Sequence, residues 1–229
     1  MSVSLRCYST SLGCPKNRVD TERLLGSLGV ALVPVESPDE AELVFINTCA
    51  FIQPATEESV RTIAQAIADI EELPKRPLLA VAGCLVGRYH AEDLAPELPE
   101  VDLWLDNSDL EAWPAMLARK LGLPEPTVPG RILSTGPSYA WLKISDGCRH
   151  ACSFCAIPNI RGGHRSHCKD MIVREARALL DQGVNIAFDT IGKCNYQPDV
   201  SRADWLSRLC AEGYDTQIVM SMDITRRSN

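Results

Sequence analysis

The chain has 229 residues, of which 45% are hydrophobic and 23% are charged, and its net charge is −7 at pH 7. These values are typical of a folded globular protein. No apolar run approaches the roughly 20 residues that a membrane span needs, and the N-terminus lacks the apolar core of a secretory signal. We therefore expect a cytoplasmic protein without a membrane anchor. In that reducing compartment, ten cysteines favour metal binding or catalysis over disulfides, although some can be small buried hydrophobic residues.

The charge is unevenly distributed along the chain. Residues 1–122 carry 10 basic and 19 acidic side chains, a net charge of −9, whereas residues 123–229 carry 13 basic and 11 acidic side chains, a net charge of +2. An acidic first half argues against nucleic acid wrapped over the surface and favours a basic protein partner. A plain solvated acidic face is the alternative interpretation.

The first half alternates short apolar runs with amphipathic helical patterns, which is typical of an α/β fold. One helix is predicted to start after Pro15 and end at Gly29, another to begin with Pro54, and a third to follow Ser108. Residues 1–122 are therefore predicted to form a flavodoxin-like open parallel sheet with helices on both faces. The predicted strands are Leu5–Leu12, Leu43–Asn47, Leu78–Ala82 and Val101–Leu105.

A stretch rich in proline and glycine separates this region from the next. The segment "LGLPEPTVPGRILSTGPS" holds four prolines and three glycines, and it predicts a linker over residues 123–138. A second α/β series is predicted beyond it. Its expected elements are a strand at 139–144, a helix near 170–182, a strand at Val184–Phe188, a helix near 203–212 and a strand at Thr216–Met220.

Three cysteines lie close together in "DGCRHACSFCAIPNIRG", residues 146–162. Cys148, Cys152 and Cys155 have C-x3-C-x2-C spacing and follow a predicted strand, so they belong at the carboxyl end of that strand, where α/β sites gather. Nearby basic residues outnumber the single Asp146, which suits thiolates; they are Lys143, Arg149, Arg161, Arg165 and Lys169. A zinc site is the alternative interpretation, and its fourth ligand would come from His150, His164, His167 or Cys168.

Another set of cysteines follows apolar strands of the first half. Cys14 lies in "SLGCPKN", Cys49 in "INTCAF" and Cys84 in "VAGCLVGRY". Because the carboxyl ends of parallel strands share one edge of a sheet, these thiols are predicted to meet at a second three-thiolate site. The remaining cysteines are predicted to be structural or incidental; they are Cys7, Cys168, Cys194 and Cys210.

The cysteine loop resembles that of the radical S-adenosylmethionine (SAM) enzymes, including an aromatic residue, Phe154, before the last cysteine. In that superfamily three thiolates hold a [4Fe–4S] cluster whose fourth iron binds SAM. The wider set of motifs, "SLGCPKN", "NTCAFI", "GCLVGRY" and the loop itself, closely resembles the methylthiotransferases from about residue 5 to about residue 190. "SLGCPKN" and "IPNIRG" resemble the branch that modifies ribosomal proteins (RimO type) more than the branch that modifies tRNA adenosine (MiaB type).

This resemblance implies a fold, a set of ligands and a chemistry. The fold is the flavodoxin-like domain followed by the first part of a radical-SAM (βα) partial barrel over residues 139–229. Phe154 and Asp189 match cofactor-binding positions, although "AFDTIG" departs from the family's "QDT"-like motif at Phe188. The implied cofactors are SAM and two [4Fe–4S] clusters, one held by Cys14, Cys49 and Cys84 and the other by Cys148, Cys152 and Cys155.

In the implied reaction, one SAM methylates a sulfur at the first cluster, and another is cleaved to a 5′-deoxyadenosyl radical. The radical abstracts hydrogen from the β-carbon of an aspartate in a small-subunit ribosomal protein, and that carbon takes the methylthio group. The implied partners are this ribosomal protein and a reductant such as flavodoxin or ferredoxin, without direct nucleic-acid binding. Two alternatives remain, namely a tRNA methylthiotransferase and a non-catalytic iron–sulfur protein.

The length of the second half limits what it can form. A full (β/α) barrel takes about 250 residues, whereas residues 139–229 suffice for about two and a half βα units of the six or so in a radical SAM barrel. We therefore expect an incomplete radical SAM core, a truncated chain and no C-terminal β-domain.

Overall fold

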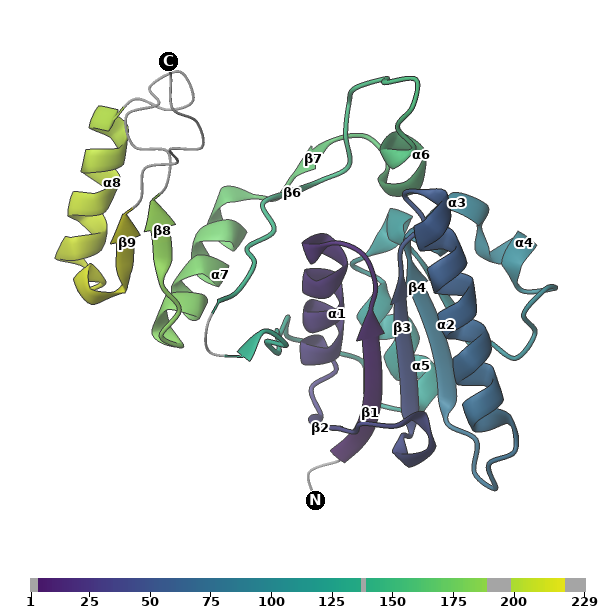
Figure 1. Ribbon diagram of the computed structural model, residues 1–229. Helices are drawn as coiled ribbons and strands as arrows, with labels where there is room; N and C mark the ends of the chain where they lie inside the picture. Colours follow the sequence, from purple (N-terminus) through teal and green to yellow (C-terminus); the bar gives the residue numbers. More distant parts are fainter. Residues whose placement is uncertain (1–3, 137–138, 189–198, 221–229) are drawn as a thin grey trace, which may run out of the picture. The chain divides into compact units, whose positions relative to one another are not determined.

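The computed structural model of the chain describes residues 4–136, 139–188 and 199–220 (Figure 1). Two compact units are formed. The first comprises Met1–Ser134 and Lys143–His167, and the second comprises Thr135–Leu142 and Cys168–Asn229. In the described part of the chain, no helix combines the length and apolar character that crossing a membrane requires.

The first unit is built on a sheet of five parallel strands in the order β2-β1-β3-β4-β5. This is the flavodoxin-like order, as the sequence predicted. The short edge strand β2 was not predicted, because its four residues are mostly exposed and show no buried alternation. The strands are β1 (Ser4–Ser11), β2 (Ala31–Pro34), β3 (Leu43–Thr48), β4 (Leu78–Gly83) and β5 (Leu103–Asp106).

Helices cover both faces of this sheet (Figure 1). Side chains alternate between the faces, so that Phe45 packs with α1 and α5 while Val44 and Ile46 pack with α2 and α3. All three side chains are fully buried, which places a core on each face. The helical elements are α1 (Pro15–Ser27), η1 (Pro38–Glu40), α2 (Gln53–Glu71), α3 (Cys84–Tyr89), α4 (Ala91–Leu94), η2 (Asn107–Asp109) and α5 (Trp113–Leu121).

The last helix of this sheet domain begins later than predicted. Ser108 was expected to precede it, but Asp106 caps a 3-10 turn by accepting a hydrogen bond from the Ser108 backbone at 2.6 Å. The helix α5 begins only at Trp113, with a proline in its first turn. The capping interaction is therefore real, but it ends in a single turn rather than starting the helix.

The segment Lys143–His167 packs with the sheet domain. It contains α6 (Ile157–Arg161) and a short antiparallel ladder of β6 (Ser145–Asp146) and β7 (Arg165–Ser166). Contact with α3 is close, since a Cβ added at Gly87 would lie 2.5 Å from the carbonyl oxygen of Ile160. Ile160 itself is buried and joins the core on that face.

The strand predicted at 139–144 does not form, so that prediction was wrong. These residues are irregular, and the ladder begins only at Ser145. The apolar alternation that suggested a strand is left without a sheet to pack on, because Tyr139, Trp141 and Ile144 remain about half exposed. Alternation alone is a weak signal when no neighbouring strand is supplied.

Part of the predicted linker is fixed to α1. The carboxylate of Glu22, whose side chain is 2% exposed, accepts two hydrogen bonds from Arg131, at 3.0 and 2.7 Å. The same carboxylate accepts from the backbone N–H and the hydroxyl of Ser134, at 2.9 and 2.7 Å. The backbones of Gly26 and Gly130 approach so closely that neither position has room for a side chain. Residues 130–134 are thus packed against the sheet domain.

The second unit alternates helices with parallel strands. Strand β8 pairs with β9 in parallel, from Ile186 opposite Ile218 to Phe188 opposite Met220. This confirms the predicted α/β class for the second half. The elements are α7 (Lys169–Asp181), β8 (Ile186–Phe188), α8 (Asp199–Ala211), η4 (Asp215–Gln217) and β9 (Ile218–Met220).

Candidate functional site

The three cysteines of the sheet domain lie at one edge of the sheet. Cys14 is the N-cap of α1, shortly after β1, while Cys49 directly follows β3 and Cys84 directly follows β4. Because β1, β3 and β4 are adjacent and parallel, their carboxyl ends share this edge. Cys14 and Cys49 flank the point where the strand order reverses, which is where open α/β sheets bind ligands.

Glycines let the backbone come close to these cysteines. Gly13 has φ +84°, and a Cβ there would lie 2.7 Å from the sulfur of Cys49. Gly83, which precedes Cys84, has φ +99°, and its Cβ would lie 2.6 Å from a backbone oxygen of β3. Only glycine tolerates both the positive φ and the close approach. The glycines at these two positions therefore bring the loops after β1 and β4 against the end of β3.

The environments of the three thiols differ. Cys14 is exposed, whereas Cys49 and Cys84 are buried. Burial raises the pKa of the Cys84 thiol, Arg161 acts in the opposite direction, and Cys49 and Cys14 raise that pKa further. Cys14 and Cys49 each therefore lie within electrostatic reach of Cys84.

The cysteines suit a metal cluster by their chemistry and their placement. Thiolates are the usual ligands of iron–sulfur clusters, and Gly13 lets the loop that carries Cys14 approach Cys49 more closely than a residue with a side chain could. Within the described residues, no three or more His, Cys, Asp or Glu side chains are placed so that they could hold a metal ion. The thiol chemistry and the adjacent strand ends are what suit this edge to a cluster.

Polar side chains hold the loops around these cysteines. The Asn17 amide donates to the carbonyls of Leu12 and Thr48, both at 2.8 Å, and so joins the loop after β1 to the end of β3. The Ser59 hydroxyl of α2 donates to the carbonyl of Cys49 at 2.7 Å and accepts from its N–H at 3.0 Å. Ser59 was not predicted from the sequence, since serine in mid-helix carries no signal for such a role.

The second cysteine set lies on the loop between β6 and β7. Cys148 and Cys155 are half-buried, and Cys152 is exposed. The N–H of Cys148 donates to the carbonyl of Gly162 at 3.1 Å, and the N–H of Cys155 donates to that of Cys152 at 3.1 Å. These bonds close the loop at its base and form a turn across its last two cysteines. Phe154, predicted to lie beside a cofactor, has 88% of its surface exposed.

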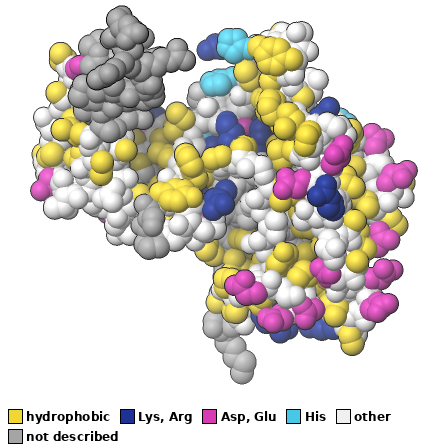
Figure 2. All heavy atoms as spheres, viewed as in Figure 1, with side chains coloured by type: hydrophobic (Ala, Val, Ile, Leu, Met, Phe, Trp, Pro, Cys, Tyr) yellow, Lys and Arg dark blue, Asp and Glu magenta, His cyan; other side chains and the backbone are white. Residues whose placement is uncertain are grey.

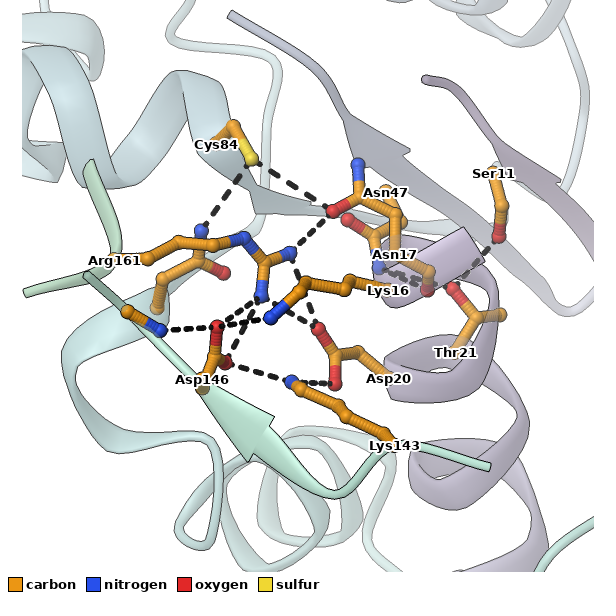
Figure 3. A network of polar contacts seen from close by, with 12 residues as sticks. Ser11, Lys16, Asn17, Asp20, Thr21, Asn47, Cys84, Lys143, Asp146 and Arg161 are labelled. Atoms are coloured by element: carbon orange, nitrogen blue, oxygen red, sulfur yellow. Dashed lines mark hydrogen bonds and ion pairs between the residues drawn. The ribbon is translucent and has the colours of Figure 1, made fainter. Parts of the chain in front are cut away.

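A buried network of charges connects this loop to helix α1 (Figure 3). Lys143 pairs with Asp20 at 2.6 Å and with Asp146 at 2.7 Å, and Arg161 pairs with the same two carboxylates at 3.2 and 3.0 Å. All four side chains are at most 5% exposed. Lys16, which is partly exposed, approaches Asp146 at 3.7 Å.

The network changes the interpretation of the basic residues near the loop. Burial tends to raise the pKa of Asp146, but Arg161 and Lys143 outweigh it and hold that pKa well below its usual range. Burial tends to lower the pKa of Arg161, whereas Asp20, Cys84 and Asp146 keep it above its usual value. Lys143 and Arg161 therefore neutralise acids of the protein, rather than facing the loop cysteines as the sequence suggested.

A cavity of about 420 Å³ lies beside α6, within the first unit. Its lining includes the buried Arg161 and several polar side chains, namely His90, Asp106, Ser108, His164 and Arg165. His90 has φ +61°, an uncommon value for a residue other than glycine. The volume lies within the range of ligand pockets. Part of the lining comes from the segment Lys143–His167, which also carries the second cysteine set.

The other predicted positions lie apart from these sites or outside the described residues. Cys7 is buried in β1, where burial raises its pKa to about 12. Cys168 caps α7, and Cys210 is exposed on α8. Asp189, predicted to bind a cofactor, and Cys194 lie outside the described residues.

Comparison with protein families assigns the first domain. Residues 6–106, which run from β1 to β5, match the model described as "Uncharacterized protein family UPF0004". Residues 162–229 match the model of the Phosphotriesterase family. The described part of that second segment contains α7, β8, α8 and β9, and it is α/β in class like the first unit.

Several curated relatives align with most of the chain, and each carries the name ribosomal protein uS12 methylthiotransferase RimO. The protein from Nitratidesulfovibrio vulgaris (strain DP4) is 71% identical over 177 residues, which cover 77% of this chain and 41% of the relative. The protein from Lawsonia intracellularis is 57% identical over 184 residues, with 80% and 42% covered. Over the residues that align, this chain is similar to the proteins named RimO.

A more distant RimO-type relative, from Aquifex aeolicus, is 49% identical over 177 residues, covering 76% of this chain and 38% of the relative. The chain thus spans about two fifths of the length of the RimO-type proteins that it matches. The branch predicted from "SLGCPKN" and "IPNIRG" is confirmed. The fold explains why these two motifs belong together, because Asn17 of the first and Arg161 of the second are joined by a hydrogen bond of 2.5 Å.

Proposed function

We propose that this chain carries the methylthiotransferase domain and the cluster-binding loop of a radical SAM enzyme. The enzyme would add a methylthio group to the β-carbon of an aspartate in ribosomal protein uS12. This proposal is supported by the position of three cysteines at adjacent strand ends, in the same compact unit as the Cys148–Cys155 loop. The names of the relatives supply the ribosomal substrate.

Each cysteine set would hold one [4Fe–4S] cluster. Cys14, Cys49 and Cys84 supply one set of ligands, and Cys148, Cys152 and Cys155 supply the other. When bound, the clusters and SAM would supply sulfur methylation and the radical chemistry that functionalises an unactivated carbon. Three ligands leave one iron of each cluster without a protein ligand, and Phe154 and Asp189 are proposed to contact SAM.

The protein's own residues have positioning roles in this proposal. Ser59 fixes the backbone of Cys49, so that this ligand is held from α2. Asp146 and Arg161 fix the two ends of the second loop by their buried ion pair. Cys14 and Cys152 are exposed, which leaves one thiol of each set accessible to small molecules and to a redox partner.

The surface of the first unit suits a basic protein substrate. Acidic side chains are spread over this unit (Figure 2), and residues 1–122 carry a net charge of −9. Such a surface attracts a basic ribosomal protein and repels nucleic acid. The cavity beside α6 is a suitable place for a segment of that substrate. The reductant would be a flavodoxin or ferredoxin, and the enzyme would be cytoplasmic.

Iron content tests the two-cluster assignment in this chain. After anaerobic reconstitution the chain should hold about eight irons. Serine at Cys14, Cys49 and Cys84 should leave about four, and serine at Cys148, Cys152 and Cys155 should also leave about four. Serine at the buried Cys7, the matched control, should leave the count unchanged. About four irons in the unmutated chain would refute the two-cluster assignment.

Product analysis distinguishes the proposed function from the two alternative functions. Mass spectrometry of uS12 after reaction with the full-length enzyme should show one added methylthio group on an aspartate. A methylthio group on tRNA adenosine instead would support the tRNA branch. Clusters that accept electrons without any cleavage of SAM would support a non-catalytic iron–sulfur protein.

A further inference from the structure

Two polar side chains lie beside the sulfur of Cys84, a residue with 4% of its surface exposed. Asn107, from the turn after β5, donates its amide N–H to the sulfur at 3.8 Å. The Cys84 thiol itself donates to the side-chain oxygen of Asn17 at 3.7 Å. Arg161 donates to that same oxygen at 2.5 Å, so its guanidinium lies beside the cysteine (Figure 3).

Positive charge from Arg161 lies beside this cysteine, at the edge of the buried charge network. Asp20 and Asp146 are matched by Lys143 and Arg161, and Lys16 adds a third cation 3.7 Å from Asp146. The four buried side chains are therefore neutral as a set, and Lys16 places a further positive charge at the partly exposed edge of the network.

We propose that Asn107 and Arg161 are positioning residues that raise the reduction potential of the cluster held by Cys14, Cys49 and Cys84. Hydrogen bonds and positive charge at a ligand sulfur stabilise the reduced cluster, because it carries one more negative charge than the oxidised cluster. The inference rests on the proposed function, since it requires a cluster at these cysteines.

Arg161 comes from the segment that carries the second cysteine set. Arg161 ends α6, six residues after Cys155, and its carboxylate partner Asp146 lies two residues before Cys148. The segment that carries one cysteine set thus places a cation beside a ligand of the other. The potential of the first cluster should therefore depend on how the Cys148 loop is seated.

The test isolates the first cluster. In the full chain with alanine at Cys148, Cys152 and Cys155, only that cluster should load, and its midpoint potential is measured by redox titration with electron paramagnetic resonance. Asn107→Leu removes the donor while keeping the size and leaves the charges in place. It should shift the reduction equilibrium about tenfold toward the oxidised state, a fall of about 59 mV for one electron. Arg161→Gln should lower the potential further, and the potential of Arg161→Lys should lie between those of the wild type and Arg161→Gln.

The control is Arg131→Gln, which disrupts another buried ion pair on α1, the pair with Glu22, and should leave the potential unchanged. Wild-type potentials in Asn107→Leu and Arg161→Gln, with iron retained, would overturn the inference. Loss of iron from a folded Asn107→Leu chain would also overturn it, because the amide would then be needed for binding. If Arg161→Gln fails to fold, the midpoint potential of Asn107→Leu alone decides whether the inference holds. A background chain that binds no iron would instead refute the proposed function.

Discussion

Removing the charge of Lys143 should destabilise the first unit by about 3 kcal/mol. Its ammonium lies 2.6 Å from Asp20 and 2.7 Å from Asp146, and its side chain is 2% exposed. Breaking a buried pair by deleting one partner costs about 3–5 kcal/mol. The lower end applies to Lys143→Met, because Arg161 still pairs with both carboxylates and methionine keeps most of the apolar stem.

Urea unfolding of the purified chain, followed by tryptophan fluorescence to which the buried Trp113 contributes, measures this effect. In thermal unfolding the same loss corresponds to a fall of about 6–12 °C in Tm, at 2–4 °C per kcal/mol for a chain of this size. Lys75→Met is the matched control, because Lys75 is 85% exposed and lies 3.9 Å from Glu42. Its effect should stay within about 0.5 kcal/mol.

A double variant separates the charge from the packing. Adding Asp146→Asn to Lys143→Met removes the carboxylate that was left in excess, so part of the lost stability should return. If Lys143→Met destabilised no more than Lys75→Met, the network would contribute nothing measurable. The network would then not be what holds the Cys148–Cys155 loop on α1.

Three further outcomes follow from single positions. Glu22→Gln should lower the free energy of unfolding by about 1–3 kcal/mol and speed tryptic cleavage after Arg131. An unchanged cleavage rate would show that Glu22 does not hold the segment around Arg131 on α1. Because its pKa is raised to about 12, Cys7 should resist iodoacetamide at pH 8 while exposed Cys210 reacts, as mass spectrometry can show; rapid labelling of both would contradict this. Gly87→Ala should lower stability by about 1–3 kcal/mol in thermal unfolding, since its Cβ would lie 2.5 Å from a carbonyl oxygen of α6, and a neutral result would mean that the helices separate freely.

The sheet and its cysteine edge were predictable because their signals are local. Each of β3 and β4 is a short apolar run followed at once by a cysteine, and parallel topology then brings Cys49 and Cys84 together. The edge strand β2 gave no such signal, since its residues are mostly exposed. The predicted strand at 139–144 had the right alternation but no sheet to join.

The charge network could not be predicted, because its partners are far apart in the sequence. Asp20 and Lys143 are separated by 123 residues, and Asp20 and Arg161 by 141. In the sequence, Lys143 and Arg161 look like solvated cations around the Cys148 loop, and Asp20 looks like an ordinary residue of an amphipathic helix. Their burial follows only from the packing of the segment Lys143–His167 on the sheet domain.

Burying four charges seldom increases stability over an apolar core, so another advantage must account for the network. Cys14 is the N-cap of helix α1. The helix carries Asp20, which binds Lys143 before the second cysteine loop and Arg161 after it. An apolar patch would permit sliding, whereas paired charges of fixed geometry define a single register. The same helix therefore sets the position of one cysteine of the first set and of both ends of the loop that carries the second.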